Sequence, residues 1–130
     1  MIIVDSSALI AILLNEAEKL SFAEVVVEAD GARISALNYF EASMVAEARQ
    51  GDAGCRDLDR LAENLGLEVV AFEAGHIQAA REAFRSYGKG RHRAALNFGD
   101  CCAYALAKVL DVPLLFKGND FALTDIKRAL

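Results

Sequence analysis

Four carboxylates occupy positions where a chain of alternating strands and helices normally carries apolar or capping residues: Asp5, Glu41, Asp100 and Asp120. Asp5 directly follows the apolar run 2–4, and Asp120 comes shortly after the apolar run 113–116. If the fold brings such acids together, each raises the pKa of the others, and a divalent cation relieves the repulsion. The acids therefore make a metal site the first hypothesis.

Glu41 gives the sharpest single argument. Apolar residues stand at helical spacings from it, which predicts that its side chain lies on the buried face of a helix: Leu37, Met44, Val45 and Ala48. An unpaired ionised carboxylate in apolar surroundings is strongly destabilising, so this position needs an explanation. Besides a metal, a basic partner or an edge position would explain Glu41. The other three acids could be simple helix caps or a turn residue.

The apolar pattern predicts strands that alternate with helices along the whole chain. Strands are expected at 2–4, 33–35, 67–72 and 112–116. Helices are expected at 8–14, 16–28, 36–50, 55–64, 73–87 and 98–110. Ser6 or Ser7 would cap the first helix and Ser35 the third, whereas residues 121–130 have no clear assignment.

This alternation favours an α/β fold with a mainly parallel sheet covered by helices on both faces. Ligands bind beyond the carboxyl ends of the strands in such sheets. All four acids lie just after strands or in the first turns of the helices that follow them. The sequence thus predicts one acidic pocket at that edge of the sheet.

Composition limits the classes of protein that need to be considered. The 130 residues suit a single domain over 1–130, and the hydrophobic fraction of 55% predicts a substantial core. We expect neither a membrane span nor a signal peptide, because Asp5 interrupts the N-terminal apolar run. Three cysteines without a disulfide or zinc pattern suggest a reducing cytoplasm. A net charge of −5 means that any contact with nucleic acid must be local.

Carboxylates without paired histidines or cysteines favour a hard cation, Mg²⁺ or Mn²⁺. Such ions serve phosphoryl chemistry, because they bind a phosphate oxygen and lower the pKa of a bound water. No histidine suggests itself as a general base, since His76 falls within an expected helix and is interpreted as structural or exposed. The residues therefore predict a nuclease or a phosphatase whose metal generates the nucleophile.

The most basic segment lies just before the helix that carries Asp100. It offers four candidate substrate-binding residues, namely Lys89, Arg91, His92 and Arg93. A small cationic patch beside an acidic pocket would hold a phosphodiester backbone. The alternative is a solvated surface loop. Tyr39, Phe40 and Phe98 could stack on bases, although core packing is the more ordinary role for each.

Five segments in this order resemble PIN-domain proteins and, within that family, VapC-type toxins of type II toxin–antitoxin systems. The segments are 3–9, 35–43, 88–92, 96–101 and 115–121 with Thr124 and Asp125. The resemblance implies a three-layer α/β/α PIN fold and a Mg²⁺- or Mn²⁺-dependent endoribonuclease. It also implies inhibition by a VapB-type antitoxin and, frequently, a homodimer that assembles further with that antitoxin.

The resemblance also assigns roles to individual residues. The acidic quartet would hold the metal, with Asp5 and Asp100 as the most direct ligands, while Ser7 and Asn97 support the pocket. Three positions depart from the family pattern: Ser6 stands for the usual Thr, Arg93 for a frequent Pro, and Asn119 for an acid, which puts a second metal position in doubt. Two other interpretations stay open, a PIN-fold binding protein without catalysis and a receiver-like signalling module that binds Mg²⁺.

Overall fold

A four-stranded parallel sheet forms the centre of the computed structural model, which describes residues 1–130. The strand order is β3-β2-β1-β4, and every neighbouring pair is parallel. The strands are β1 (Ile2–Val4), β2 (Ala32–Ser35), β3 (Leu67–Val70) and β4 (Leu114–Leu115). All four carboxyl ends therefore point to the same edge of the sheet, as the sequence predicts.

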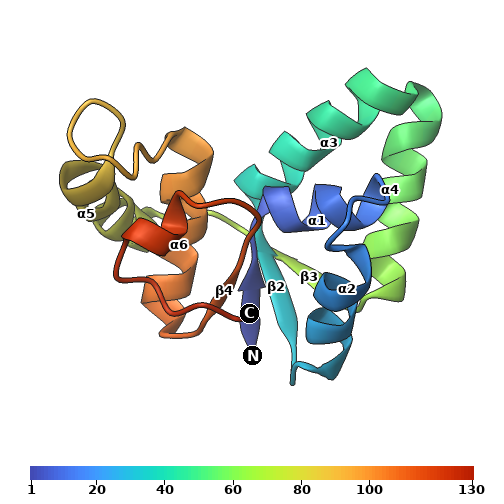
Figure 1. Ribbon diagram of the computed structural model, residues 1–130, viewed down its shortest axis with the longest axis horizontal. Coiled ribbons are helices and arrows are strands. Elements are labelled where there is room, and N and C mark those ends of the chain that lie inside the picture. The colour runs from blue at the N-terminus through green and yellow to red at the C-terminus, as the bar shows by residue number, and fades with distance from the viewer.

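Helices cover both faces of the sheet and give the three-layer α/β/α arrangement (Figure 1). One face carries α1 (Ser6–Leu13), α2 (Lys19–Glu28), α3 (Ala36–Gln50) and α4 (Asp52–Asn64). The other face carries α5 (Ile77–Tyr87) and α6 (Phe98–Leu110). Two short 3₁₀ helices, η1 (Ala74–His76) and η2 (Phe121–Leu123), complete the chain.

The central strand β1 contributes to two hydrophobic cores. Ile2 and Val4 point into the core under α1 to α4, whereas Ile3 points into the core under α5 and α6. Successive side chains of a strand face opposite sides of a sheet, so a continuous apolar run is what a central strand needs. β4 divides in the same way, with Leu115 on the first side and Leu114 on the second.

The start of α1 differs from the sequence prediction. Asp5, rather than Ser6 or Ser7, is the N-cap, and the two serines form the first turn of the helix. A carboxylate accepts the free N–H groups of a first turn more strongly than a hydroxyl does, and this explains the shift. The ordinary capping role foreseen for Asp5 is thus present, and it coexists with the placement of Asp5 in a pocket.

Several helix and strand boundaries also differ from those predicted from the sequence. α2 begins at Lys19 rather than at residue 16, and α4 already begins at Asp52. β3 ends at Val70, two residues early, because only four of its residues pair with β2. The segment 73–87 is divided between η1 and α5, and the last strand is limited to Leu114–Leu115.

The buried face of α3 is not the one that the apolar pattern predicts. Met44 and Ala48 are exposed, and the residues turned inward are Asn38, Ala42 and Ala46. The reason lies in the close packing of α3 against α4. A β-carbon added to Gly54 of α4 would lie only 2.2 Å from the carbonyl oxygen of Ala46, so only small side chains fit between these helices.

The C-terminal segment, unassigned from the sequence, runs beside the edge strand β4. Leu114 accepts a hydrogen bond from the N–H of Ala129 at 3.0 Å and donates its own N–H to Lys127 at 2.8 Å. These bonds cover the exposed edge of β4. No helix in the chain combines the length and the apolar character needed to cross a membrane.

Candidate active site

A pocket of about 280 Å³ lies at the carboxyl end of β1, between the first turns of α1, α3 and α6. It contains three of the four predicted acids and both predicted supporting residues. Its lining consists of Asp5, Ser6, Ser7, Ile10, Glu41, Val45, Asn97 and Asp100. Parallel strands thus bring together residues that are up to 95 positions apart in the chain.

Asp5 is the most deeply placed acid, with 3% of its surface exposed. One oxygen, Oδ2, accepts hydrogen bonds from the N–H of Ser7 at 3.0 Å and from its Oγ at 2.6 Å. The other oxygen, Oδ1, is buried without any partner. Burial raises the pKa of Asp5 to about 7, despite the lowering effect of both Ser7 bonds, and the charges of Asp100 and Glu41 add to the rise.

Ser7 connects Asp5 to the loop that follows β4. Its Oγ donates to Asp5 and accepts the N–H of Lys117 at 3.0 Å. The Lys117 ammonium lies 2.8 Å from a carboxylate oxygen of Glu16 and 3.3 Å from one of Glu18. This single hydroxyl therefore fixes the first acid relative to a second strand end.

Asp100 and Asn97 form a reciprocal cap at the start of α6. The Asn97 side chain accepts the N–H of Asp100 at 2.9 Å, and the Asp100 side chain accepts the N–H of Asn97 at 3.0 Å. Burial raises the pKa of Asp100 to about 6, against the hydrogen bond from Asn97, and the charges of Asp120 and Glu41 raise it further. The alternative of a helix cap is correct for Asp100, and the cap turns its carboxylate toward the other acids.

Glu41 is held by contacts that the sequence did not indicate. The hydroxyl of Ser6 donates to its Oε1. Its carboxylate also rests on the bare α-carbon of Gly99, since a β-carbon there would lie 2.5 Å from Oε2. Asn38, fully buried, donates its Nδ2 to the Gly99 carbonyl at 2.9 Å and so ties α3 to α6.

Ser6, Asn38 and Gly99 are therefore positioning residues that sequence reasoning missed. Asn38 did carry a signal, because an amide three residues before Glu41 on a helix that faces the sheet must find a buried partner. Gly99 carried a weaker one, a glycine in the first turn of a strongly apolar helix. No basic partner accompanies Glu41, whose carboxylate instead opens into the pocket.

Asp120 is placed differently from the other acids. It is exposed, precedes η2 and does not line the pocket. Its charge nevertheless reaches the site, because it contributes to the raised pKa of Asp100. The structure thus gathers three members of the predicted quartet and leaves the fourth at the rim.

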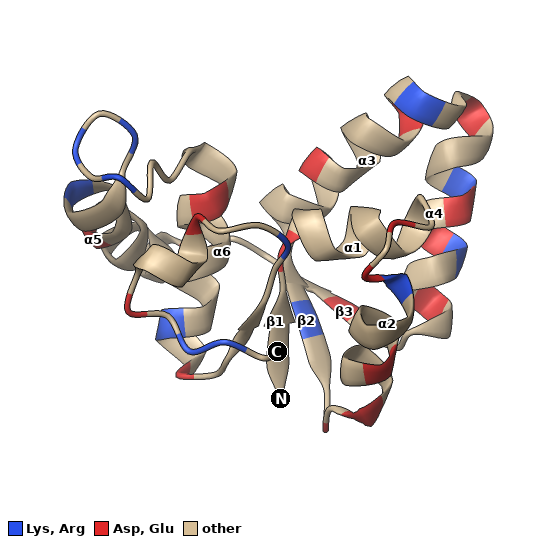
Figure 2. Ribbon diagram, viewed as in Figure 1, with Lys and Arg blue, Asp and Glu red and all other residues tan.

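The basic loop lies beside α5, near the end of the sheet that carries the acids (Figure 2). Lys89, Arg91 and Arg93 are exposed, and none is within ion-pair distance of a carboxylate. Arg91 lies over the ring of Phe84 at 5.0 Å. His92 is different: its Nδ1 accepts the N–H of Ala94 at 3.0 Å, and this bond shapes the loop.

A second, apolar groove of about 650 Å³ lies between α5 and α6 and shares Asn97 with the acidic pocket. Phe98 and Phe84 contribute to its wall, with 75% and 46% of their surfaces exposed. Phe40 on α3 is also 64% exposed. The expectation of core packing is therefore wrong for Phe40 and Phe98.

Two other aromatic side chains have structural roles. Tyr39 is half-buried and donates its hydroxyl to Asp59 on α4 at 2.6 Å. His76 is buried, and its Nδ1 accepts the N–H of Glu73 at 3.3 Å. His76 is thus structural, as expected, and supplies no general base to the pocket.

The donor set fits a hard divalent cation. It consists of carboxylate oxygens, one of which, Asp5 Oδ1, is buried and lacks any hydrogen-bond partner. Mutual repulsion also contributes to the raised pKa values of Asp5 and Asp100, and a cation would reverse it. The acids line one pocket but are not arranged as a closed coordination site. No group of three His, Cys, Asp or Glu side chains is clustered tightly enough to hold an ion.

A comparison with protein families matches residues 2–127 to the PIN domain. The chain belongs to the PIN-domain family. Ribonuclease VapC30 of Mycobacterium tuberculosis is 50% identical over 125 residues, which cover 95% of both chains. Ribonuclease VapC of Mycolicibacterium smegmatis is 46% identical over 124 residues, or 95% of this chain and 96% of that relative. These relatives confirm the resemblance to VapC-type proteins.

Solved structures confirm the fold at much lower identity. Mycobacterium tuberculosis VapC20, described as a sarcin–ricin loop cleaving toxin, superposes with a TM-score of 0.77 and 16% identity, covering 97% of this chain and 96% of that one. VapBC2 of Rickettsia felis, bound to a DNA fragment from its promoter, gives 0.76 and 16%, covering 98% and 96%. PIN-domain ribonucleases are metal-dependent in general.

Proposed function

We propose that this protein is the toxin of a type II toxin–antitoxin pair and acts as a Mg²⁺-dependent endoribonuclease that hydrolyses RNA phosphodiester bonds. The observation that carries the proposal is the acidic pocket itself, which Asp5, with a buried oxygen that lacks a partner, lines together with Glu41 and Asp100. Full-length relatives named VapC ribonucleases support the reaction class.

Each pocket residue has a distinct part in this proposal. Asp5, Glu41 and Asp100 would hold the cation, and Asp120 would complete the set from the rim. Ser7 holds the Asp5 carboxylate in place through two hydrogen bonds, and Asn97 fixes Asp100 through the reciprocal cap. The capped geometry keeps these carboxylates in place before substrate arrives, which reduces the reorganisation that catalysis requires.

Mg²⁺, or Mn²⁺ in its place, supplies two effects when bound: it neutralises charge on the phosphate and lowers the pKa of the attacking water. The chain itself positions the RNA. Lys89, Arg91 and Arg93 lack carboxylate partners, so their charges are available to the phosphate backbone. His92 contributes by shaping the loop that carries these three side chains.

The test is cleavage of RNA by the purified protein with Mg²⁺ or Mn²⁺, compared with the variants Asp5→Asn and Asp100→Asn. Asparagine keeps each cap, so both variants should fold. We expect loss of cleavage in both. Equal cleavage by all three proteins would refute the assignment, whereas a folded wild type that binds RNA without cutting it would favour the catalytically inactive binding protein.

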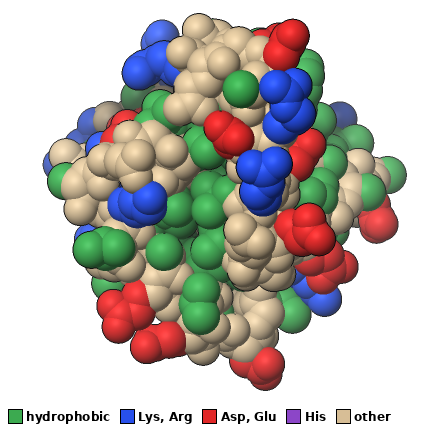
Figure 3. Space-filling view, turned by 90° about the vertical axis from the view of Figure 1, so that its right-hand side faces the viewer, with side chains coloured by type: hydrophobic (Ala, Val, Ile, Leu, Met, Phe, Trp, Pro, Cys, Tyr) green, Lys and Arg blue, Asp and Glu red, His purple; other side chains and the backbone are tan.

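We also propose a VapB-type antitoxin as partner. The solved neighbours include toxin–antitoxin complexes. The face over α2 and α4 has hydrophobic side chains gathered at its centre and charged ones around it (Figure 3). On α2, Leu20 and Val27 are 80% and 66% exposed, two turns apart on one side of the helix. Val27→Asp should weaken antitoxin binding in calorimetry, and unchanged affinity would exclude this face.

A homodimer is the second assembly that we propose, through the apolar groove between α5 and α6. Its wall exposes two phenylalanine rings, those of Phe84 and Phe98, and exposed apolar surface of this kind can mark a protein–protein contact. Light scattering should give twice the chain mass for the wild type and the monomer mass for Phe98→Asp. A monomeric wild type would exclude the dimer.

The remaining assignments concern the chain as a whole. We propose that residues 1–130 form one domain, because β1 is shared by both hydrophobic cores, and that the protein works in the cytoplasm, where its three free cysteines stay reduced. A receiver-like module has no support, because no aspartate ends β2 or β3 and the chain matches the PIN domain. Incubation with a small phosphodonor should leave the protein mass unchanged.

A further inference from the structure

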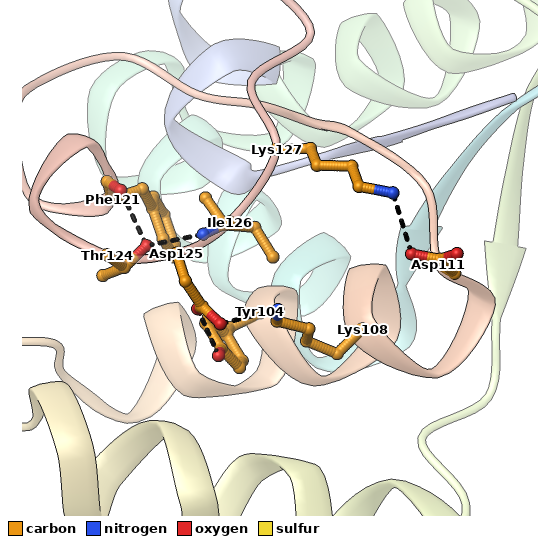
Figure 4. A network of polar contacts seen from close by, with 8 residues as sticks. All are labelled: Tyr104, Lys108, Asp111, Phe121, Thr124, Asp125, Ile126 and Lys127. Atoms are coloured by element: carbon orange, nitrogen blue, oxygen red, sulfur yellow. Dashed lines mark hydrogen bonds and ion pairs between the residues drawn. The ribbon is translucent and has the colours of Figure 1, made fainter.

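Asp125, in the C-terminal segment, is held against α6 by two side chains (Figure 4). Its Oδ1 accepts the hydroxyl of Tyr104 at 2.6 Å, and its Oδ2 lies 2.8 Å from the ammonium of Lys108. Tyr104 is 6% exposed and half of the Asp125 side chain is covered. This is the closest polar tie between the C-terminal segment and α6.

The pKa values keep this tie intact over a wide pH range. Burial alone would raise the pKa of Asp125, but the hydrogen bonds from Lys108 and Tyr104 outweigh it and hold that pKa below its usual range. Burial and the bond to Asp125 raise the pKa of Tyr104, so the phenol stays protonated and donates. The tie thus persists wherever the pocket carboxylates are ionised.

The partners of Asp125 share a face of α6 with a pocket acid. Asp100, Tyr104 and Lys108 are spaced four residues apart, so they lie in a row along the helix. Asp125 follows Asp120 by five residues. A segment fixed to Tyr104 and Lys108 therefore holds Asp120 near the row that begins with Asp100. In agreement, the charge of Asp120 contributes to the raised pKa of Asp100.

Between Asp120 and Asp125 the chain has little freedom. Phe121 is buried with its ring 5.2 Å from that of Phe116. The hydroxyl of Thr124 donates to the Phe121 carbonyl at 2.7 Å and accepts the N–H of Ile126 at 3.2 Å. Residues 118–120 are exposed and lie between Lys117, which is bound by Ser7 and Glu16, and the anchored segment that begins at Phe121. The position of Asp120 is therefore set from both sides.

We propose that Asp125, Tyr104 and Lys108 form a latch that positions Asp120 at the rim of the acidic pocket as the outer member of the metal site. This role rests on the proposed function, since it assumes that the pocket binds a cation. The latch residues touch neither metal nor RNA: they are positioning residues, and their effect on the site passes through Asp120.

A tie with only a structural role would affect stability but not metal binding. The chain contains a second ion pair that serves as a matched control. Lys127 and Asp111 form a second ion pair, of 3.0 Å, between the same segment and the far end of α6 (Figure 4). Asp111→Asn and Asp125→Asn both remove one carboxylate charge that pairs with a lysine. Only Asp125 lies on the side of the segment that leads to Asp120.

The experiment measures Mn²⁺ binding to the metal-free protein by electron paramagnetic resonance, together with thermal unfolding. Outer residues of a metal site contribute about tenfold to affinity. We expect Asp125→Asn and Tyr104→Phe each to weaken Mn²⁺ binding about tenfold, and Asp111→Asn to leave it within about twofold. In an Asp120→Asn background, adding Asp125→Asn should cause no further loss, because the residue through which it acts is already changed.

Several results would overturn the latch. One is equal Mn²⁺ affinity in Asp125→Asn and wild type, and another is the same loss in Asp111→Asn. A third is a full additional loss in the Asp120→Asn background, which would show that Asp125 acts by another route. A wild type that binds no Mn²⁺ would refute the proposed function and the latch together. A wild type that binds Mn²⁺ as tightly as Asp125→Asn would refute the latch alone.

Discussion

Replacing Gly99 by alanine should separate catalysis from stability. The Glu41 carboxylate rests on the Gly99 α-carbon, and an added β-carbon would lie 2.5 Å from Oε2 and 2.7 Å from Oε1. Ordinary contact begins at about 3.4 Å. The carboxylate must therefore move by about 0.9 Å, which it can do because it ends a flexible side chain.

The size of the effect follows from that displacement. Misplacing a group of an active site by about 1 Å can cost about 100-fold in rate. Folding should not suffer, because alanine in place of glycine within a helix stabilises by about 0.5–1 kcal/mol. We thus expect cleavage by Gly99→Ala to fall by a factor of about 30–100, with a melting temperature equal to or slightly above that of the wild type.

The assay is single-turnover cleavage of a labelled RNA with saturating Mg²⁺, beside thermal unfolding of the same samples. Gly54→Ala is the matched control, because its β-carbon would meet the Ala46 backbone at 2.2 Å, which cannot rotate away. That variant should lose about 1–3 kcal/mol of stability and keep its rate per folded molecule. Wild-type cleavage by Gly99→Ala, or a loss explained by unfolding, would refute the reasoning.

Three further predictions concern charge. Between the unfolded pKa of Asp5, about 3.9, and its folded value of about 7, the native state binds the extra proton. The metal-free protein should therefore lose stability as pH rises from 5 to 8, by on the order of 3 kcal/mol. Urea unfolding measures this loss, and Asp5→Asn should flatten the profile, whereas a wild-type slope in Asp5→Asn would contradict it. Ser7→Ala removes a bond that lowers the pKa of Asp5, so the acid limb of the rate–pH profile should move to higher pH; an unmoved limb would count against this role of Ser7. Lys89→Ala and Arg93→Ala should raise KM and flatten its salt dependence while kcat and melting temperature stay unchanged; an unaltered KM in both would leave the basic loop as a solvated surface.

Parts of the fold that depend on local signals could be predicted closely. The bounds of α6 were predicted at both ends, because its long apolar stretch stands out from the residues on either side. The convergence of Asp5, Glu41 and Asp100 also followed from sequence, since parallel strands place their carboxyl ends at one edge. Neither conclusion needed any knowledge of side-chain packing.

The features that could not be predicted from the sequence depend on contacts between elements that are distant along the chain. The inward face of α3 is set by how closely α4 approaches it, and this distance is not written in the periodicity of α3. The hydrogen bond from Asn38 to Gly99 spans 61 positions. Asp120 stays at the rim because buried Phe121 and the bonds of Thr124 decide where the segment turns.

Asp5 and Asp100 each have two roles, since both cap a helix and both line the acidic pocket. This combination determines which mutations would inactivate such a toxin. Asparagine caps a helix about as well as aspartate, and a single nucleotide change converts an aspartate codon into an asparagine codon. A single nucleotide change at either position would therefore abolish the proposed activity with little loss of folding stability. Under selection against the toxin, we expect inactive variants that are folded and resist proteolysis, rather than unfolded variants that proteases degrade.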